Sequence, residues 1–420
     1  MYKVMPLLTV DPCFIYKYKK FCTLIAVFFG VLTTPLWAQQ AQLSSETKVS
    51  LITASPGNEL YTIFGHTALR IYDPKTEIDR TYNYGTFDFD TKGFYWKFAM
   101  GNLRYFLSTT PYENAKNTYL GDGRTITEQR LNLSPEQTQQ LFRYLQTNAR
   151  PENRYYSYEF FYDNCTTRVY EALNAVIGDS LRLQKPINPA KNSFRQFINS
   201  YLEPVPWVKL GVNLVLGLPT DEIPSGSEML FLPNLLKKRF ANAKIQNADT
   251  SVALVDDQTI YTPANKAVLN PPVLTPKLVF WSLFVLVIPL GIAFSNKQSL
   301  WRWFDCVLFG IVGGIGFLIL ILWLFSAYPT TTWNANIVWT LIAPIILYVV
   351  IHKKKCRLQT WKLTEPVILG IVFMAMIFFL IHQDIPPALY PVLVLLIFRG
   401  WMCFFMSKPK YATLLEVNSN

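Results

Sequence analysis

Cys165 is the residue of this sequence whose position most clearly suggests chemistry. It follows an aromatic, strand-like run (residues 158–162) and the pair Asp163-Asn164, and apolar residues at helical spacing come after it. Asp and Asn are common helix N-caps, so the sequence predicts that Cys165 falls in the first turn of a helix. The free N–H groups and the dipole of a helix N-terminus favour a thiolate over a thiol. We therefore expect Cys165 to be a reactive nucleophile, the alternative being an inert core cysteine.

A thiol nucleophile needs a base, and His66 is the candidate. It lies in a strand-like run, residues 64–72, and between residues 39 and 272 the sequence holds no other histidine and no cysteine besides Cys165. By itself His66 could equally be a structural histidine after a glycine turn. The pairing of two unique residues favours a catalytic role for both.

A third group is expected to fix the tautomer of the imidazole. Residues 73–76 are typical of a turn, and residues 82–87 read as the return strand of a hairpin beside His66. Asn83 and Tyr84 on that strand are therefore the candidate orienting residues, although either could be an ordinary strand residue.

Further polar residues are candidates for binding substrate. Asn164 lies next to the thiol, and Arg104 and Glu59 could orient a polar head group or simply be solvated. The backbone N–H of Cys165 could form part of an oxyanion hole.

Several other kinds of site find no support. One histidine and one cysteine supply too few metal ligands, and the CxxC, HExxH, GxSxG and GxGxxG patterns do not occur. We expect no metal and no cofactor.

The residues around Cys165 and His66 predict a mixed α+β domain over residues 39–240. Strand-like alternation over residues 124–133 is followed by Ser134, Pro135 and Gln137, the pattern of a helix N-terminus with a capping box. Residues 205–218 are apolar but interrupted by Pro and Gly; we favour core and linker there, with a lipid-contacting surface as the alternative. Residues 241–276 are polar and then Pro-rich, typical of a linker.

The first 38 residues resemble a secretory signal peptide, with an uncleaved anchor as the alternative: a basic segment precedes the apolar residues 21–36, and Ala38 is a plausible cleavage point.

The C-terminal part, residues 277–407, predicts five transmembrane helices. Its apolar runs are residues 278–294, 306–325, 337–351, 367–381 and 388–406. Lys and Arg occur in alternate loops and in the tail, residues 408–420, whereas residues 326–336 and 382–387 contain none. The positive-inside rule then places the C-terminus in the cytoplasm and the Cys165 domain in the periplasm. Much of the net charge of +11 lies beside these runs, so we expect no nucleic-acid partner.

The motifs together resemble a known family. An F-G-H strand before an N-C helix start resembles the circularly permuted papain-like, NlpC/P60-related group. More narrowly, SPGNELYTIFGHTALRIYDP, TYNYGTFDF, FYDNCTTRVYEAL and EMLFLPNLL resemble the Lnb family of Bacteroidota. That resemblance implies a periplasmic papain-like domain followed by membrane helices in the inner membrane.

The resemblance also implies an activity, lipoprotein N-acyltransfer. Cys165, with His66 as base, would take an acyl chain from a phospholipid and pass the thioester to the α-amino group of a diacylated lipoprotein. Water must be kept from the thioester, and residues 205–218 and the membrane helices are where we expect that exclusion. Related acyltransferases carry a second histidine on the next strand; this sequence has none there.

Two alternatives stay open from the residues alone. The same Cys–His pair would serve a membrane-tethered peptidase or amidase that acts on cell-wall peptides. An envelope binding or assembly protein without catalysis is the other alternative.

Overall fold

The computed structural model describes residues 42–184, 192–246, 250–295, 297–341 and 383–405. The described residues from Ser44 onward belong to one compact unit. The predicted signal peptide, the fourth apolar run, most of the third and the C-terminal tail lie outside the described residues.

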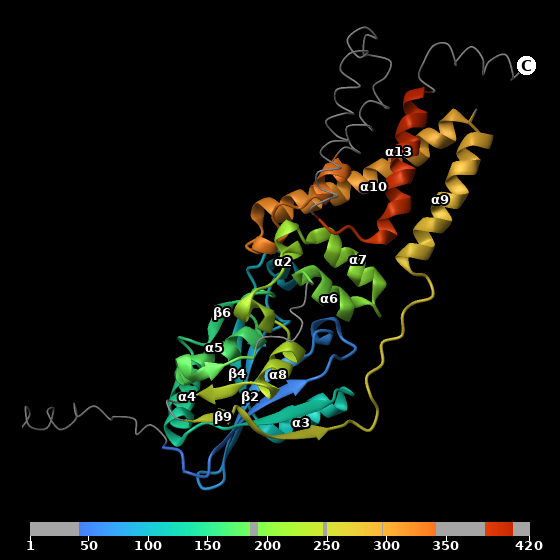
Figure 1. Ribbon diagram of the computed structural model, residues 1–420. Coiled ribbons are helices and arrows are strands. Elements are labelled where there is room, and N and C mark those ends of the chain that lie inside the picture. The colour runs from blue at the N-terminus through green and yellow to red at the C-terminus, as the bar shows by residue number, and fades with distance from the viewer. Residues whose placement is uncertain (1–41, 185–191, 247–249, 296, 342–382, 406–420) are drawn as a thin grey trace, which may run out of the picture. The chain divides into compact units, whose positions relative to one another are not determined.

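A seven-stranded sheet organises the N-terminal part (Figure 1). Its strand order is β10-β5-β1-β2-β3-β4-β6, and every neighbouring pair is antiparallel. The strands are β1 (Lys48–Ala54), β2 (His66–Asp73), β3 (Ile78–Thr86), β4 (Arg104–Pro111), β5 (Ile126–Leu131), β6 (Tyr155–Ser157) and β10 (Val255–Tyr261). The predicted β2–β3 hairpin is confirmed, with the register Leu69↔Tyr82 to Asp73↔Ile78.

Helices α3 (Tyr112–Gly121), α5 (Cys165–Ile177) and α8 (Pro233–Ala241) pack on this sheet. The other helices of the N-terminal part are α2 (Phe94–Ala99), α4 (Pro135–Asn148), which packs on α5, α6 (Phe194–Leu202) and α7 (Pro206–Val215). On the α3 face, Ile52, Ala68 and Ile126 pack against Tyr112. Residues one position along each strand point to the opposite face, where α5 packs on β2 and α8 packs on β1.

The capping pattern at Ser134 forms as the sequence predicts. The Ser134 hydroxyl accepts from the backbone N–H of Gln137, and the Gln137 side chain accepts from the backbone N–H of Ser134. Both interactions satisfy N–H groups that the first turn of α4 leaves unpaired.

The predicted linker over residues 241–276 is wrong in its first half. β8 (Lys244–Gln246) and β9 (Ser251–Ala253) form a small sheet with β7 (Leu181–Arg182), and β10 adds an edge strand to the large sheet. Most of β10 is exposed, so it lacks the apolar face that would have marked it as a strand. After β10 the chain contacts the sheet domain again, because the N–H of Ala267 donates to the carbonyl of Gly123 at 2.8 Å.

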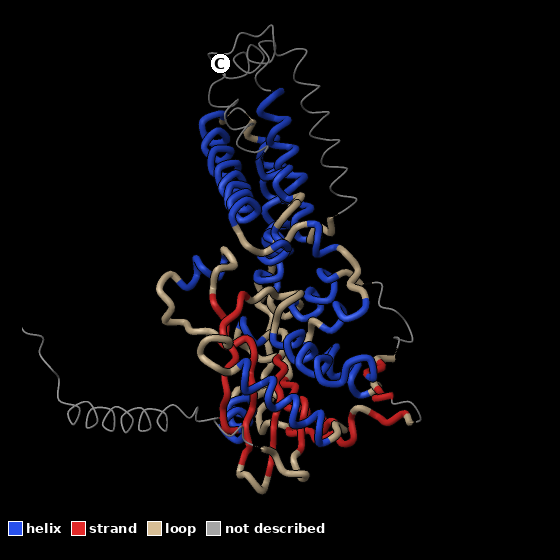
Figure 2. The backbone as a smooth tube through the Cα atoms, turned by 90° about the vertical axis from the view of Figure 1, so that its left-hand side faces the viewer, coloured by secondary structure: helices blue, strands red, loops and turns tan. Residues whose placement is uncertain are grey.

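The C-terminal part changes to helices and loops (Figure 2). It contains α9 (Pro276–Ala293), α10 (Gln298–Phe325) and α13 (Tyr390–Phe405). Among the described residues, two helices are long and apolar enough to span a membrane, Pro276–Ala293 and Ser299–Phe325. A buried ion pair between Asp305 of α10 and Arg399 of α13, with an N–O distance of 2.8 Å, joins two of these helices.

The helices α6 and α7 connect the two parts. Leu210 of α7 belongs to a buried cluster with Phe309 of α10 and Trp339. The segment 205–218 is therefore core in part: Leu210 lies in a core shared with the membrane helices, whereas Trp207 is 42% exposed.

Candidate active site

Asn164 fixes the position of the candidate nucleophile. As predicted, it is the N-cap of α5, and Cys165 is the first helical residue. Its Oδ1 accepts from the backbone N–H groups of Thr166 and Thr167 at 2.7 and 3.0 Å. Its Nδ2 donates to the carbonyls of Phe160 and Phe231 at 2.6 and 2.8 Å. These four bonds use the whole amide, so Asn164 positions the thiol and has no polar group left for a substrate.

The thiol lies where the sheet opens. The β2–β3 ladder ends at Leu69↔Tyr82, and the backbone N–H of Thr67, two residues beyond on β2, donates to Sγ of Cys165. The Thr67 and Thr166 hydroxyls are 3.3 Å apart and join β2 to the first turn of α5. Cys165 is 8% exposed. The helix N-terminus thus places Sγ beside the residue that directly follows His66.

Gly85 allows this close approach from β3. A bulge lies between Asn83 and Thr86, and Gly85 within it has a φ of +88°, in the region that favours glycine. A Cβ at Gly85 would lie 3.5 Å from the Cβ of Cys165 and 3.6 Å from the Tyr158 ring. The bulge therefore lets the strand diverge and leaves room for the thiol.

The resting thiol is neutral, which corrects the thiolate expectation. Burial raises the pKa of Cys165 above its ordinary value. The donors Thr67 N–H, Thr166 hydroxyl and Cys165 N–H, together with the charge of Arg124, lower the pKa but do not outweigh burial. The helix N-terminus acts in the expected direction, but the loss of water around Sγ has the larger effect.

His66 is a neutral base in the resting state. It is the first residue of β2 and is partly buried. Burial and the nearby charge of Arg124 lower its pKa to about 4, although a hydrogen bond with Asn83 acts in the opposite direction. A neutral imidazole can accept the proton of a neutral thiol as that thiol attacks.

Of the two predicted orienting residues, the structure brings Asn83 to the imidazole and not Tyr84. Asn83 bonds to His66, while the Tyr119 hydroxyl donates to Asn83 Oδ1 at 3.3 Å. Tyr84 points to the opposite face of β3, where its ring meets that of Tyr156 at a centroid distance of 6.3 Å. Tyr84 as orienting residue is therefore wrong on geometry.

Arg104 and Glu59 lie apart from this group. Arg104 is exposed, with its guanidinium 5.8 Å from the Tyr155 ring. Glu59 is exposed and precedes the short helix η1 (Leu60–Thr62). Across the described ranges neither forms a hydrogen bond or ion pair with Cys165, His66 or Asn83.

Sequence reasoning missed two residues of the site, Arg124 and Tyr119. The Arg124 guanidinium lies 5.0 Å from the Tyr119 ring, whose centroid is 6.1 Å from that of His66. Neither residue belongs to a motif. The usable signal is alternation on β5: Arg124 has the same parity as Ile126, whose side chain faces α3.

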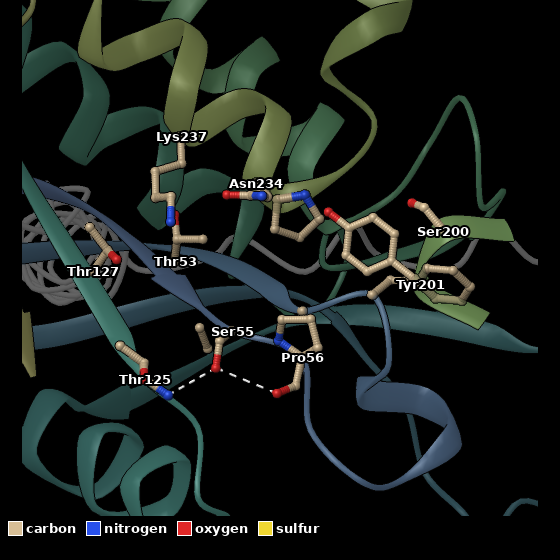
Figure 3. A pocket seen from close by; sticks show the side chains of 13 residues that line it. Thr53, Ser55, Pro56, Thr125, Thr127, Ser200, Tyr201, Asn234 and Lys237 are labelled. Carbon is tan, nitrogen blue, oxygen red and sulfur yellow. Dashed lines mark hydrogen bonds between the residues drawn. The ribbon is translucent and has the colours of Figure 1, made fainter. Parts of the chain in front are cut away.

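A cavity of about 470 Å³ lies close to the site on the other face of the sheet. Lys237 and Asn234 of α8 project into it opposite Ser55 and Thr125 (Figure 3). Gly65 also lines it, but Cys165 and His66 do not. In the part of the chain that the structure describes, no group of three His, Cys, Asp or Glu side chains could hold a metal ion.

Two loops of the helical part contact the Cys165 domain. In the loop after α10, the N–H of Ala327 donates to the carbonyl of Met100 at 2.9 Å, and the Thr330 hydroxyl lies 3.5 Å from a carboxylate oxygen of Glu159. Before α13, the N–H of Asp384 lies 3.3 Å from a carboxylate oxygen of Asp221. These are the two loops without Lys or Arg, so the loops that lack basic residues are those that contact the thiol domain.

The loop after α10 approaches Cys165 through tyrosines and Glu159. Glu159 accepts from the N–H groups of Phe161 and Tyr162, at the turn before Cys165. Burial raises the pKa of Glu159 and raises that of Tyr328 to about 12. The Tyr105 ring stacks on Tyr158 at 4.3 Å, next to the thiol. The site is therefore continuous with the helical part.

Two protein-family models match the chain. Residues 33–199 match the Lnb N-terminal periplasmic domain, and residues 269–410 match the Lnb transmembrane domain. No curated protein and no solved structure matches it.

Proposed function

Because the chain belongs to the Lnb family, we propose that it is a lipoprotein N-acyltransferase with a papain-like catalytic domain. It is a membrane protein whose N-terminal part is periplasmic. Four points go beyond family membership and belong to the proposal: the acyl-transfer reaction, the phospholipid donor, the diacylated lipoprotein acceptor and a cytoplasmic C-terminus.

The observation that carries the proposal is the contact of the thiol site with the helical part. A hydrolase that acts on soluble peptides needs only a tether, whereas here residues 326–336 and 383–384 form hydrogen bonds with the thiol domain. A site at the membrane surface fits two substrates that are both held in the bilayer.

Exposed aromatic side chains support the same location. Tyr95 and Trp96 of α2 are 83% and 65% exposed, and Tyr61 of η1 is 60% exposed. The end of α2 bonds to the loop after α10, where the Ser326 hydroxyl lies 3.3 Å from the carbonyl of Ala99. Trp and Tyr are favoured at the membrane–water interface, so this patch fits contact with lipid.

The first half-reaction uses the neutral pair. Sγ of Cys165 attacks the acyl ester carbonyl as His66 accepts the thiol proton. The backbone N–H of Cys165 supports the charge on the carbonyl oxygen. His66 then returns the proton to the departing alcohol oxygen of the lysophospholipid, and an acyl thioester remains.

The second half-reaction forms an amide. The α-amino group of the acceptor has a pKa near 8, so roughly a tenth of it is neutral at pH 7. Its nitrogen attacks the thioester carbonyl, His66 accepts the excess proton, and the thiol leaves and is protonated again. Asn83 keeps the imidazole oriented through both steps.

The experiment that tests the proposal is mass spectrometry of the N-terminal peptide of one lipoprotein. Cells carry wild-type protein, Cys165→Ser or Cys306→Ser as the sole copy; Cys306 is a free cysteine of α10 and is the matched control. We expect the N-acyl chain with wild type and Cys306→Ser, and its loss with Cys165→Ser. Equal N-acylation in all three strains would overturn the proposal, and cell-wall peptides would be the next substrates to test.

A further inference from the structure

Arg124 is a buried arginine that forms no ion pair with a carboxylate of the described residues. It is 3% exposed, its Nε donates to the carbonyl of Ser55 at 2.7 Å, and its Nη2 has no hydrogen-bond partner among the described residues. Burial of an unpaired guanidinium is costly, so its presence needs a reason.

The other buried arginines of the described chain show the contrast. Arg195 is 0% exposed and binds Asp221, with two further donors on backbone carbonyls. Arg399 is 2% exposed and binds Asp305. Each of these two charges is neutralised inside the protein, whereas that of Arg124 is not.

The position of Arg124 relates it to the candidate active site. It precedes β5, and β5 pairs with β1 at Ala54, the same residue that pairs with His66. Its guanidinium lies over Tyr119, which binds Asn83. Its positive charge also lowers the pKa of both His66 and Cys165. Arg124 thus lies on the His66 side of the sheet, close enough to affect both reacting groups.

The turn at residues 55–58 holds this side chain in place. A Cβ at Gly57 would lie 3.0 Å from Cδ of Arg124 and 2.7 Å from the Thr62 hydroxyl. The turn therefore packs directly on the arginine and restricts its position.

We propose that Arg124 binds the phosphodiester of the acyl donor while the acyl ester lies at Cys165, and so selects phospholipids over uncharged diacylglycerol lipids. This inference rests on the proposed function. A phosphate carries a full negative charge and matches the fork of a guanidinium. A tetrahedral oxyanion is short-lived and would leave the arginine unpaired throughout substrate binding.

The test compares two donors with the same acyl chains, phosphatidylethanolamine and diacylglycerol. The assay measures the rate at which full-length protein in bilayers transfers an acyl chain from each donor to a diacylated lipopeptide. The variants are Arg124→Gln, Arg124→Lys and Arg130→Gln. Arg130 lies on β5, pairs with Asp256 and is the matched control. We expect Arg124→Gln to lower transfer from phosphatidylethanolamine about 10- to 100-fold more than it lowers transfer from diacylglycerol, the value of a charge-assisted contact. Arg124→Lys should keep part of the preference for phosphatidylethanolamine over diacylglycerol. Arg130→Gln should keep all of this preference.

Other outcomes are separable. Equal loss with both donors would overturn the inference and make Arg124 a structural or oxyanion-binding residue. No transfer by wild type from any donor would refute the proposed function instead.

A binding readout covers the case in which Arg124→Gln does not fold. Dihexanoyl phosphatidylcholine should protect Cys165 of the wild type from iodoacetamide at lower concentration than dihexanoylglycerol does. Arg124→Lys should reduce the difference between the concentrations at which the two compounds protect Cys165. Equal protection of the wild type by both compounds would contradict the inference.

Discussion

At the residue scale, the candidate nucleophile and base could be chosen from the sequence because each is unique between residues 39 and 272. Asn83 followed from the hairpin, and the choice between Asn83 and Tyr84 required knowing which face of β3 each occupies. Arg124 could not be predicted, since it is distant in sequence from both and has no motif. The charge state of Cys165 was predicted wrongly, because the sequence shows a helix N-terminus but not how much water burial removes.

The neutral pair predicts a particular pH dependence. With the pKa of His66 near 4, the imidazole accepts a proton at any pH above about 5 and loses this ability as the pH falls through 4. We expect the rate of thioester formation at Cys165, measured without an amine acceptor, to stay level between pH 5 and 7 and to fall below that range. Because the pKa of Cys165 is raised, iodoacetamide should alkylate it slowly at pH 6 and faster as the pH rises above 8. Fast alkylation at pH 5 would indicate a thiolate–imidazolium pair and contradict this prediction.

Substitutions at Asn83 and Tyr84, neighbouring residues of β3, should have different effects on activity. Asn83→Ala removes a hydrogen-bond partner of His66 and should lower kcat about 10-fold or more with little change in KM. Tyr84→Phe removes only a hydroxyl on the other face and should stay within about twofold of the wild type. Steady-state transfer to a lipopeptide measures both, and the reverse order of effects would restore Tyr84 as the orienting residue.

At the element scale, the N-terminus of α5 and the bulge in β3 together position the thiol. The sequence signals for α5 were strong, because the cap residue is local. The bulge could not be seen, because Gly85 acts through its contact with Cys165, a residue far along the chain. The cap of α5, which is local in sequence, and the bulge of β3, which is distant from Cys165 in sequence, thus both help to position the thiol.

The cap of α5 is expected to matter more than that of α4. Asn164→Ala removes four buried hydrogen bonds and should lower the free energy of unfolding by about 2 kcal/mol or more. Ser134→Ala removes an exposed cap and should cost about 1 kcal/mol. Thermal unfolding of the two variants compares them, and transfer activity should fall only for Asn164→Ala. Equal destabilisation would show that the buried amide adds nothing beyond ordinary capping.

At the scale of the whole molecule, the order of the parts was predictable and their connection was not. Apolar runs located α9, α10 and α13, but the sequence does not show that α7 packs against them or that the loops without Lys or Arg contact the thiol domain. Edge strand β10 was taken as linker because its residues are polar and exposed. Both errors have one origin: contacts between distant segments leave no local pattern.

The exposed aromatic residues of α2 predict a dependence on the bilayer. The double variant Tyr95→Ser/Trp96→Ser should lower transfer from long-chain lipids in vesicles about 5- to 10-fold, since interfacial aromatics aid contact with the membrane. Transfer from a short-chain donor dissolved in water should be unchanged. Ile260→Ser is the matched control, because Ile260 is 58% exposed on the far edge strand β10. Equal loss with both kinds of donor would assign α2 a structural role.

The hydrogen bond between Ala267 and Gly123 has a mechanical consequence. The chain runs from β10 past Ala267 to the first membrane helix, α9, and Ala267 is held to the residue directly before Arg124. Gly123 has a φ of +73°, and a Cβ there would lie 2.6 Å from the nitrogen of Ala267, so this fastening requires glycine. The chain between Ala267 and α9 is held once more at Leu274, whose carbonyl accepts from Nε1 of Trp207 on α7 at 2.7 Å. We therefore expect a displacement of α9 to act first on α7 and then, through the chain beyond Leu274, on the Gly123–Arg124 turn.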